Sequence, residues 1–385
     1  MENNILTNKD YTCTKRFNAE MAHIFSNCWT FCGLVEDLQE NNRYLTVVAG
    51  LTSLVVLRDE QGELKAFHNF CRHRGMKLLD GQGRLSAKIT CPYHDWTYDQ
   101  SGNLKSLPKA KQEFEGLNKA CLSLKRASVG IWRGMVWVHP DPNAVPVQQY
   151  FSGMGSHVAP YDVEALVEAK EALYEVTINA NWKLVAENYI DHYHLAQLHA
   201  GTLHMYDHKK AEFGFVDEHV FFWEPLAQAY YENIDQHSPY PLLIDKNDKK
   251  MGAWVPLLFP NVGLAESESS WSVFHIMPLS VDQTKVVVRS KVKNCSSMAF
   301  IKQATKSYTF WTSRVKAKSS QHEQSHALGS GDFMQEDIFV CEQLQQSLSN
   351  PRFEFGPSAK GGERLIRGFQ QRVNAKLTQG GFNVR

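Results

Sequence analysis

Two short pairs of cysteine and histidine lie close together in the sequence and constrain the fold more than any other feature. Cys71 and His73 form the first pair, and Cys91 and His94 form the second. Together they offer one metal site two thiolates and two imidazoles. Zn²⁺ and an iron–sulfur cluster both accept such ligands, so the spacing alone leaves a structural zinc site and an electron-carrying cluster open.

The composition of each pair separates these two kinds of site. Zinc ribbons usually present Cys-x-x-Cys pairs, whereas each pair here combines one thiolate with one imidazole. Such mixed pairs favour a [2Fe–2S] cluster, because they can place both cysteines on one iron and both histidines on the other. Because neutral imidazoles replace two thiolates, a cluster of this kind has a raised reduction potential and accepts electrons readily.

Length and charge limit the classes of protein to which the chain can belong. Its 385 residues suffice for two domains, each with its own core. Basic and acidic residues number 41 each, so no net field recruits nucleic acid or an anionic membrane. No apolar run of about 18 residues occurs, and the eight cysteines are scattered rather than arranged as a disulfide framework. We therefore expect a cytoplasmic protein without nucleic-acid or membrane partners.

Hydrophobic periodicity predicts both helices and strands, as in an α+β protein, and the expected type of element changes along the chain. A helix is expected over 14–28, followed by short β-prone runs that end a small antiparallel domain at 130–139, with a linker over 140–146. The β-prone runs of this domain are 44–48, 53–57, 64–67 and 130–139. Beyond the linker we expect strands over 172–177, 271–277 and 285–292, and helices from Asn181 and over 299–318, 332–348 and 362–377.

The segment from Asn181 to His199 is rich in possible metal ligands. Asn181 can cap a helix, and Asp191 lies three residues before His194, so the carboxylate can accept a hydrogen bond from the imidazole. His194 and His199 are separated by about 140° on a regular helix, so they converge on one metal only if the helix ends or widens near 195–198. The alternative is a set of surface or capping histidines, comprising His192, His194, His199, His204 and His208.

A carboxylate interrupts the apolar stripe of the predicted helix over 332–348. Asp337 lies in the middle of this stripe, and Glu336 lies on its edge. A lone carboxylate facing a core is costly unless it meets a cation. Either Asp337 forms a buried salt bridge with an arginine or lysine, or it completes a two-histidine, one-carboxylate triad with His194 and His199. Such a triad leaves positions on Fe(II) open for O₂.

With both segments in view, the chain resembles the oxygenase component of the Rieske non-haem iron oxygenases, the family of aromatic-ring-hydroxylating dioxygenase α subunits. The resemblance runs from about residue 17 to about residue 348 and keeps the order of the motifs. The matching residues are Cys71-x-His73-Arg74-Gly75, Cys91-Pro-Tyr-His94 with Trp96, Asn181-Trp-Lys, Asp191-x-x-His194-x4-His199, and Glu336-Asp337.

The resemblance implies a role for each of these residues. Asp191 would be the carboxylate of catalytic electron transfer, because it would link His194 to His94 of a neighbouring subunit. The cluster ligands would be Cys71, His73, Cys91 and His94, and the ligands of the mononuclear Fe(II) would be His194, His199 and Asp337.

The resemblance also implies a division into domains, electron-transfer partners and an assembly. A helical lead segment (1–39) would pack with the catalytic domain, a Rieske antiparallel β domain would cover 40–146, and a catalytic domain of antiparallel sheet wrapped around helices (helix-grip, START-like) would cover 147–385. A ferredoxin or flavin reductase would supply electrons from NAD(P)H, since the chain has no Gly-x-Gly-x-x-Gly dinucleotide fingerprint. The expected assembly is a homotrimer or an α3β3 complex.

The substrate is predicted only by class. We expect hydroxylation of an aromatic or other small organic acid with O₂ as co-substrate. A monooxygenase or N-demethylase acting on a quaternary amine, a tailoring hydroxylase of natural products, and a Rieske electron carrier without oxygenase activity remain alternatives. Aromatic residues between 213 and 231 could line a pocket for a ring or, through cation–π contacts, a quaternary ammonium, although core packing is the better explanation for most of them. They are Phe213, Phe215, Phe221, Phe222, Trp223, Tyr230 and Tyr231.

One residue departs from the family pattern. The family usually has glycine after the second histidine, and this chain has Asp95. A side chain there could restrict the loop, and a negative charge beside the cluster would disfavour its reduction. The departure bears on the potential of the cluster and leaves the expected ligands unchanged.

Overall fold

The computed structural model describes residues 4–238, 240–295 and 326–383. The helix predicted over 299–318 therefore lies outside the described residues. The chain divides into two compact units. The smaller unit holds Asn18–Ser152 with Gln379–Asn383, and the larger unit holds Met1–Phe17 and Gly153–Thr378.

The smaller unit is built on a seven-stranded antiparallel sheet and a separate three-stranded sheet. The strand runs predicted from periodicity are confirmed, except that 130–139 contains parts of two strands. The turn between these two strands places Arg133 and Gly134 at positive φ. In sheet order, the large sheet contains β1 (Thr30–Leu34), β10 (Met135–His139), β9 (Arg126–Trp132), β4 (Leu64–His68), β3 (Thr52–Arg58), β2 (Arg43–Ala49) and β5 (Gln82–Arg84), and the small sheet contains β6 (Lys88–Thr90), β7 (Thr97–Asp99) and β8 (Leu104–Ser106).

Strand β3 is buried on both faces, and this connects the sheet to the cysteine loops. Val55 and Leu57 point into one core, and Leu54 and Val56 point into another on the opposite face. The first of these cores also contains both cysteines of the predicted cluster. The loops that carry the candidate ligands are therefore packed against the sheet rather than free in solvent.

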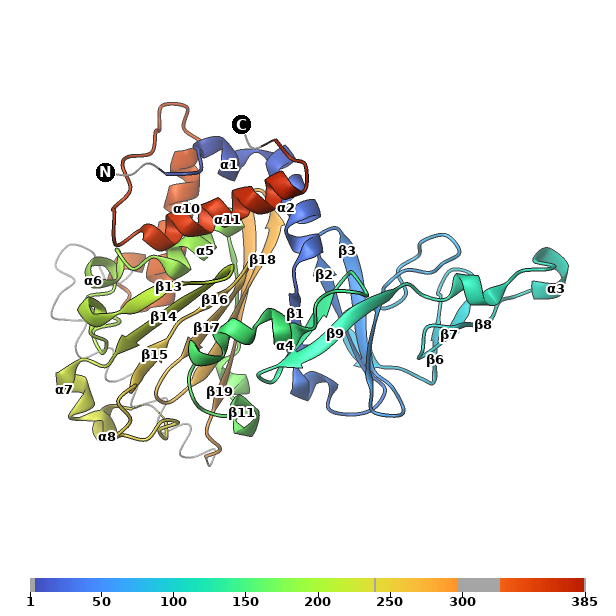
Figure 1. The fold of residues 1–385 in the computed structure, drawn as a ribbon, viewed down its shortest axis with the longest axis horizontal. Coiled ribbons are helices and arrows are strands. Elements are labelled where there is room, and N and C mark those ends of the chain that lie inside the picture. The colour runs from blue at the N-terminus through green and yellow to red at the C-terminus, as the bar shows by residue number, and fades with distance from the viewer. Residues whose placement is uncertain (1–3, 239, 296–325, 384–385) are drawn as a thin grey trace. The chain divides into compact units, whose positions relative to one another are not determined.

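The larger unit is built on a nine-stranded antiparallel sheet (Figure 1). The strands predicted over 172–177, 271–277 and 285–292 correspond to β12, β18 and β19. Along the sheet the order is β11 (Val167–Glu168), β19 (Gln283–Val292), β18 (Trp271–Ser280), β17 (Val262–Glu266), β15 (Gly252–Trp254), β14 (His219–Pro225) and β13 (Glu212–Val216), with β12 (Tyr174–Ile178) paired to β19 and β16 (Leu257–Leu258) paired to β14 and β17.

Among the described residues of this unit, three helices of nine or more residues accompany the sheet, and they confirm the predicted α+β class. They are α5 (Trp182–Ile190), α10 (Phe333–Leu348) and α11 (Arg364–Gln379). Helix α5 contacts β16, β18, β19 and α10, and Figure 1 shows all three helices grouped beside the sheet. The predicted cap is confirmed, since the side chain of Asn181 accepts a hydrogen bond from the backbone amide of Lys183.

The N-terminal segment packs onto α5 before the chain enters the smaller unit. In α1 (Asn8–Thr12), the Tyr11 hydroxyl donates a 2.8 Å hydrogen bond to Glu187, and the Nζ atom of Lys183 lies 5.3 Å from the Tyr11 ring centroid. The next helix, α2 (Thr14–His23), corresponds to the one predicted over 14–28 and belongs to the larger unit only up to Phe17. The packing expected for the N-terminal helix is thus observed for α1 and the first turn of α2.

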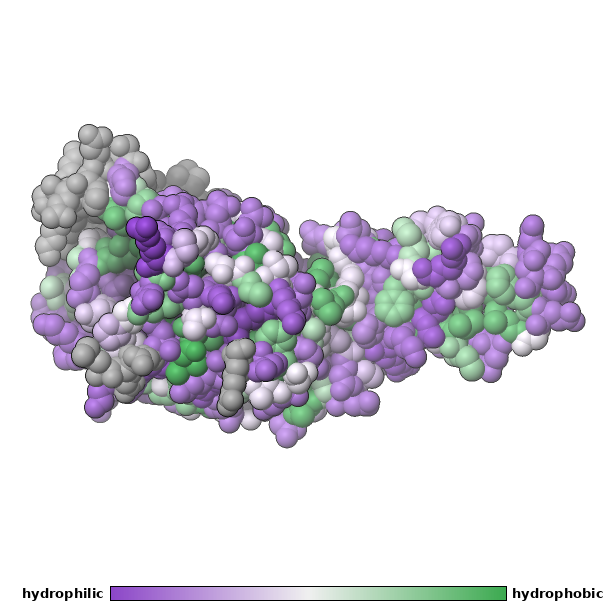
Figure 2. Space-filling view, turned by 90° about the horizontal axis from the view of Figure 1, so that it is seen from above, coloured by the Kyte–Doolittle hydropathy of each residue, from purple (hydrophilic) through white to green (hydrophobic). Residues whose placement is uncertain are grey.

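The drawn face of each unit is mostly hydrophilic, with scattered hydrophobic patches (Figure 2). Within the described ranges, no helix combines the length and the apolar character that a bilayer-crossing segment needs.

Candidate metal centres

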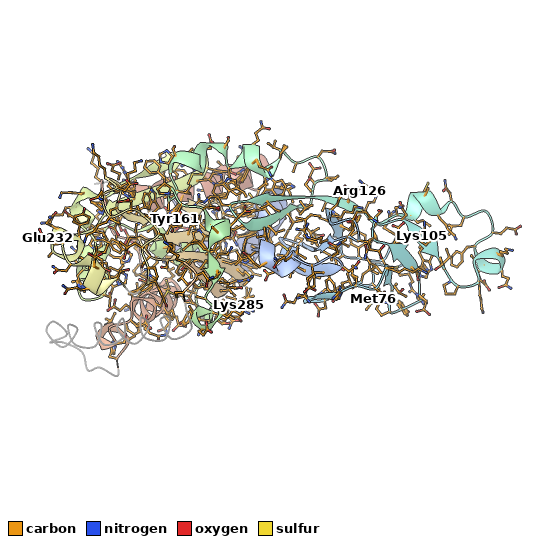
Figure 3. All side chains as sticks on the ribbon, turned by 90° about the horizontal axis from the view of Figure 1, so that it is seen from below. Met76, Lys105, Arg126, Tyr161, Glu232 and Lys285 are labelled. Atoms are coloured by element: carbon orange, nitrogen blue, oxygen red, sulfur yellow. The ribbon has the colours of Figure 1, made fainter. Side chains whose placement is uncertain are left out.

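The first ligand loop of the smaller unit is closed by two backbone hydrogen bonds. The amide of Cys71 donates to the carbonyl of Met76 at 2.8 Å, and the amide of Gly75 donates to the carbonyl of Cys71 at 2.9 Å. The loop therefore turns back on the cysteine within five residues. Met76 follows at the surface and is labelled in Figure 3.

The second ligand loop repeats this pattern. The amide of Cys91 donates to the carbonyl of Trp96, and the amide of Asp95 donates to the carbonyl of Cys91. In both loops the fourth residue after the cysteine is left-handed, with φ of +79° for Gly75 and +54° for Asp95. Glycine adopts this conformation without cost and aspartate is among the few other residues that tolerate it, so the geometry explains why the family usually has glycine at this position.

The four candidate cluster ligands face one another between the two loops. The imidazole rings of His73 and His94 lie 4.8 Å apart between centroids, and the thiols of Cys71 and Cys91 are buried. Burial raises the pKa of the Cys71 thiol. Among the described residues, Nδ1 of His73 is buried and has no hydrogen-bond partner. An orphaned imidazole nitrogen beside two buried thiols fits a [2Fe–2S] cluster, whose irons would take up these atoms.

A tyrosine that the sequence did not single out anchors the first loop. Tyr98 lies on β7, and its hydroxyl accepts a hydrogen bond from the backbone amide of Arg72 at 3.0 Å and contacts Sγ of Cys71 at 3.3 Å. The hydroxyl can thus donate to the thiolate that a cluster requires. Nearby, the ring of Trp96 stacks on His73 with 4.8 Å between centroids, which fixes the plane of this imidazole.

In the larger unit, a break after α5 brings two histidines together. The helix ends at Ile190, and a separate short helix, α6 (Leu195–Leu198), has His194 as its N-cap and His199 as its C-cap. Their Nε2 atoms lie 3.2 Å apart. The break that convergence requires is present, although the long helix ends several residues earlier than 195–198.

Helix α10 supplies the third group of this centre. Oδ1 of Asp337 lies 3.0 Å from Nε2 of His199 and 3.7 Å from Nε2 of His194, and the Asn188 side chain donates to the same oxygen at 3.2 Å. The three candidate ligand atoms all lie within 4.8 Å of one another. In the part of the chain that the structure describes, no arginine or lysine pairs with Asp337, so the salt-bridge alternative does not hold there.

The outer nitrogen of each imidazole is already engaged by a carboxylate. Nδ1 of His194 donates to Asp191 at 3.0 Å, and Nδ1 of His199 donates to Glu336 at 2.7 Å. Both Nε2 atoms can therefore turn lone pairs toward Asp337, which is favourable only with a cation between them. Burial lowers the pKa of His199, but its hydrogen bonds to Asp337 and Glu336 outweigh burial and raise the pKa to about 9. A proton satisfies this centre without metal, and a divalent cation fits the same place.

The sequence did not predict that Glu336 would contact a histidine. Its side chain is buried and also accepts a hydrogen bond from the Thr202 hydroxyl at 2.9 Å. The available signal was the adjacent Glu336 and Asp337, whose side chains diverge by about 100° on a helix and so reach the two nitrogens of His199. Asn188 was also missed, because only tertiary packing places it beside Asp337.

The other histidines of this segment have structural partners. Nε2 of His192 donates to the carbonyl of His208, Nδ1 of His208 donates to Glu224, and Nδ1 of His204 donates to the carbonyl of Gly201. Hydrogen bonds within the protein therefore account for these three histidines. Of the five histidines considered, His194 and His199 are the two that lie beside Asp337.

A cavity of about 380 Å³ opens onto this triad within the larger unit. Of the aromatic residues between 213 and 231, Phe222 and Tyr230 line it, whereas Phe213 lies outside the cavity wall under the guanidinium of Arg364. Among its described lining residues there is neither arginine nor lysine. Its acidic lining residues are Asp191, Glu224, Glu266, Glu268 and Asp337.

Family models match both units. The ring hydroxylating alpha subunit (catalytic domain) matches residues 159–379, and the Rieske [2Fe-2S] domain matches residues 28–126. The first match covers more than half of the chain.

Curated relatives include several quaternary-amine monooxygenases. The chain is 33% identical to the glycine betaine monooxygenase oxygenase subunit of Chromohalobacter salexigens over 193 residues, which is 50% of this chain and 42% of the relative. It is 25% identical to the chloroplastic choline monooxygenase of Spinacia oleracea over 349 residues, 90% of this chain and 72% of the relative. It is 31% identical to the carnitine monooxygenase oxygenase subunit of Escherichia coli K12 over 195 residues. The matches to the first and third span about half of those proteins or less.

Solved structures share the fold over nearly the whole chain. The quaternary ammonium Rieske monooxygenase CntA aligns with a TM-score of 0.73 at 22% identity, covering 96% of this chain and 94% of that one. Naphthalene 1,2-dioxygenase from Rhodococcus sp. aligns with a TM-score of 0.71 at 18% identity, covering 97% and 94%. The chain therefore belongs to the ring hydroxylating alpha subunits and contains a Rieske [2Fe-2S] domain, and its family carries a [2Fe–2S] cluster and a mononuclear iron.

Proposed function

We propose that this chain hydroxylates or N-demethylates a small alkylammonium compound with O₂ at a mononuclear iron. The observation that carries the proposal is the convergence of His194, His199 and Asp337 at the wall of a 380 Å³ cavity. These three residues would hold the metal at the cavity wall, where a small-molecule substrate could reach it.

The residues of this centre would divide into metal ligands and residues that orient those ligands. His194, His199 and Asp337 would hold the metal, which when bound supplies the reductive activation of O₂. Glu336 keeps Nε2 of His199 turned inward by accepting a hydrogen bond from Nδ1–H, and the side-chain amide of Asn188 donates a hydrogen bond that orients Asp337.

Electrons would enter through the smaller unit. A ferredoxin or flavin reductase would reduce the cluster, for which the proposed ligands are Cys71, His73, Cys91 and His94. Asp191 holds Nδ1 of His194 and its other oxygen accepts the amide of Tyr193 at 2.8 Å. We assign it the bridge from His94 of a neighbouring subunit to the iron, in a trimer or α3β3 complex.

Two observations support an alkylammonium substrate over the organic acid expected from the sequence. The names of three relatives identify glycine betaine, choline and carnitine as their substrates. The described cavity wall contains five carboxylates and neither lysine nor arginine, so it suits a cation better than an anion.

Oxygen uptake by the purified protein tests this function. The protein would be purified anaerobically, supplied with a surrogate ferredoxin and reductase, and offered choline, glycine betaine, carnitine, benzoate and naphthalene. We expect substrate-dependent oxygen uptake and an oxidised product with at least one alkylammonium compound. Products from benzoate or naphthalene alone would contradict the substrate class, and a protein with cluster iron but no oxygen uptake would support the electron-carrier alternative.

A further inference from the structure

Glu268 is a buried carboxylate in the turn between β17 and β18, and it lines the cavity. The turn is tight, because the amide of Ser267 donates to the carbonyl of Ser270 at 2.8 Å and the Ser267 hydroxyl accepts from the amide of Ser270. The backbone carbonyl of Glu268 accepts from the amide of Leu243 at 2.7 Å. The backbone position of Glu268 is therefore fixed by the fold.

The two neighbouring carboxylates of the cavity wall are satisfied by the protein. Glu266 accepts hydrogen bonds from the amide of Ala159 at 2.7 Å and from the indole of Trp271 at 3.0 Å. Glu224 accepts a 2.7 Å hydrogen bond from Nδ1 of His208. Neither needs a ligand to complete its contacts.

Glu268 differs from both. Its Oε1 atom accepts a long hydrogen bond of 3.3 Å from the Tyr230 hydroxyl, and its Oε2 atom is buried without a hydrogen-bond partner. Within the described residues, no lysine, arginine or histidine forms an ion pair with it. Burial raises its pKa, and the hydrogen bonds from its own backbone amide and from Tyr230 offset this effect only in part. An unpaired carboxylate in a cavity is costly unless something that binds there neutralises it.

Two tyrosines share the cavity wall with this carboxylate. Tyr206 and Tyr230 both line the cavity, and the Tyr230 hydroxyl contacts Glu268 directly. Burial and, after it, the charge of Glu268 raise the pKa of the Tyr206 phenol. Tyrosine faces attract cations, most strongly where water is excluded. The three side chains together form a site for a positive charge with an apolar surface.

The structure assigns Glu268, which shares the cavity wall with Tyr206 and Tyr230, as the counter-ion that receives the ammonium group of the substrate. The assignment rests on the proposed function, because it names the specificity-determining residue for an alkylammonium compound in the same cavity. Since a quaternary ammonium donates no N–H hydrogen bond, recognition by Glu268 depends on charge, and an uncharged molecule of the same shape should lose it.

Calorimetric titration of the holoenzyme with a matched pair of ligands tests the assignment. The pair is choline and its neutral carbon isostere, 3,3-dimethylbutan-1-ol. We expect the unaltered protein to bind choline at least about tenfold more tightly than the isostere. Glu268→Gln should remove this preference, Glu268→Asp should restore part of it, and both variants should retain the iron content and cluster spectrum of the unaltered protein. Glu232→Gln is the control, since this glutamate is exposed and lies at the surface in Figure 3.

Equal affinity for the two ligands in the unaltered protein would overturn the assignment, as would failure to bind choline at all. A preference that survives Glu268→Gln within twofold would overturn it as well. Oxygen uptake measured on the same preparations separates this failure from failure of the proposed function. If the protein takes up oxygen with an alkylammonium compound but the Glu268→Gln variant still prefers choline to the isostere, only the role of Glu268 is contradicted. If no oxygen is taken up, the proposed oxygenase function itself is contradicted.

Discussion

The two candidate metal centres differ in how far apart their ligands lie along the chain. The cluster ligands fall between Cys71 and His94, on two loops with the same backbone hydrogen bonds. The mononuclear centre joins His199 to Asp337, which are 138 residues apart. Local loop geometry therefore builds the first centre, whereas the second requires α10 to pack against α5. One chain can thus build one ligand set from neighbouring loops and another from helices that meet only in the folded protein.

The largest expected effect is the separate loss of each centre. Asp337→Ala should remove the mononuclear iron and abolish turnover while the cluster spectrum remains, because the cluster loops lie in the other compact unit. Cys91→Ser should remove the cluster while the triad side chains keep their positions. Iron analysis with visible absorption measures both losses. A variant that loses both centres at once would show that they are not independent.

Altering the proposed bridge should separate reduction from turnover. Asp191→Asn keeps the size of the side chain but weakens its bond to His194, so the cluster should still be reduced while turnover falls by about 100-fold. Stopped-flow reduction and steady-state oxygen uptake measure the two steps. Asp235→Asn serves as the control, because this aspartate is exposed and pairs with Lys246. Near-normal turnover in Asp191→Asn would remove the residue from the electron path.

A smaller effect is expected at the carboxylate behind His199. Glu336→Gln removes the charge that supports the imidazole, and we expect the affinity for iron to fall by about tenfold without loss of the cluster. Equilibrium competition with a chelator measures this change. Glu342→Gln on the same helix is the matched control, since Glu342 contacts Asn179 at the surface. An equal effect of both substitutions would assign the loss to helix stability.

The smallest effect compares the two cluster loops directly. Asp95→Gly should relieve the backbone strain of a non-glycine residue at positive φ and stabilise the smaller unit by up to about 1 kcal/mol. Gly75→Ala should introduce the same strain in the first loop and destabilise the unit by a similar amount. Removing the charge beside His94 should also raise the cluster potential. Thermal unfolding and a redox titration monitored by EPR measure these changes. An unchanged potential in Asp95→Gly would show that solvent screens this exposed charge.

Local patterns account for what the sequence could predict. The cysteine and histidine pairs, the Asn181 cap and the helices at 332–348 and 362–377 follow from spacing and periodicity, and the structure contains these helices. The sequence likewise identified Trp96 as part of the second motif and predicted the strands before the first loop.

Tertiary contacts account for what the sequence could not predict. Tyr98 and Asn188 look like ordinary core or surface positions until packing places them beside Cys71 and Asp337. Glu268 lies in a serine-rich turn without periodicity, so nothing in the sequence distinguishes it from the satisfied Glu266. The end of α5 at Ile190 was also missed, because the helical pattern alone does not mark the break before the short helix that His194 caps.

The most direct test is the metal content of the anaerobically purified, unaltered protein, combined with EPR of its reduced form. The account predicts about three irons and two sulfides per chain, with a Rieske-type signal, because one centre holds two irons with sulfide and the other holds a single iron. Zinc in place of iron, or only the two cluster irons in fully loaded protein, would contradict the assignment of two iron centres to one chain.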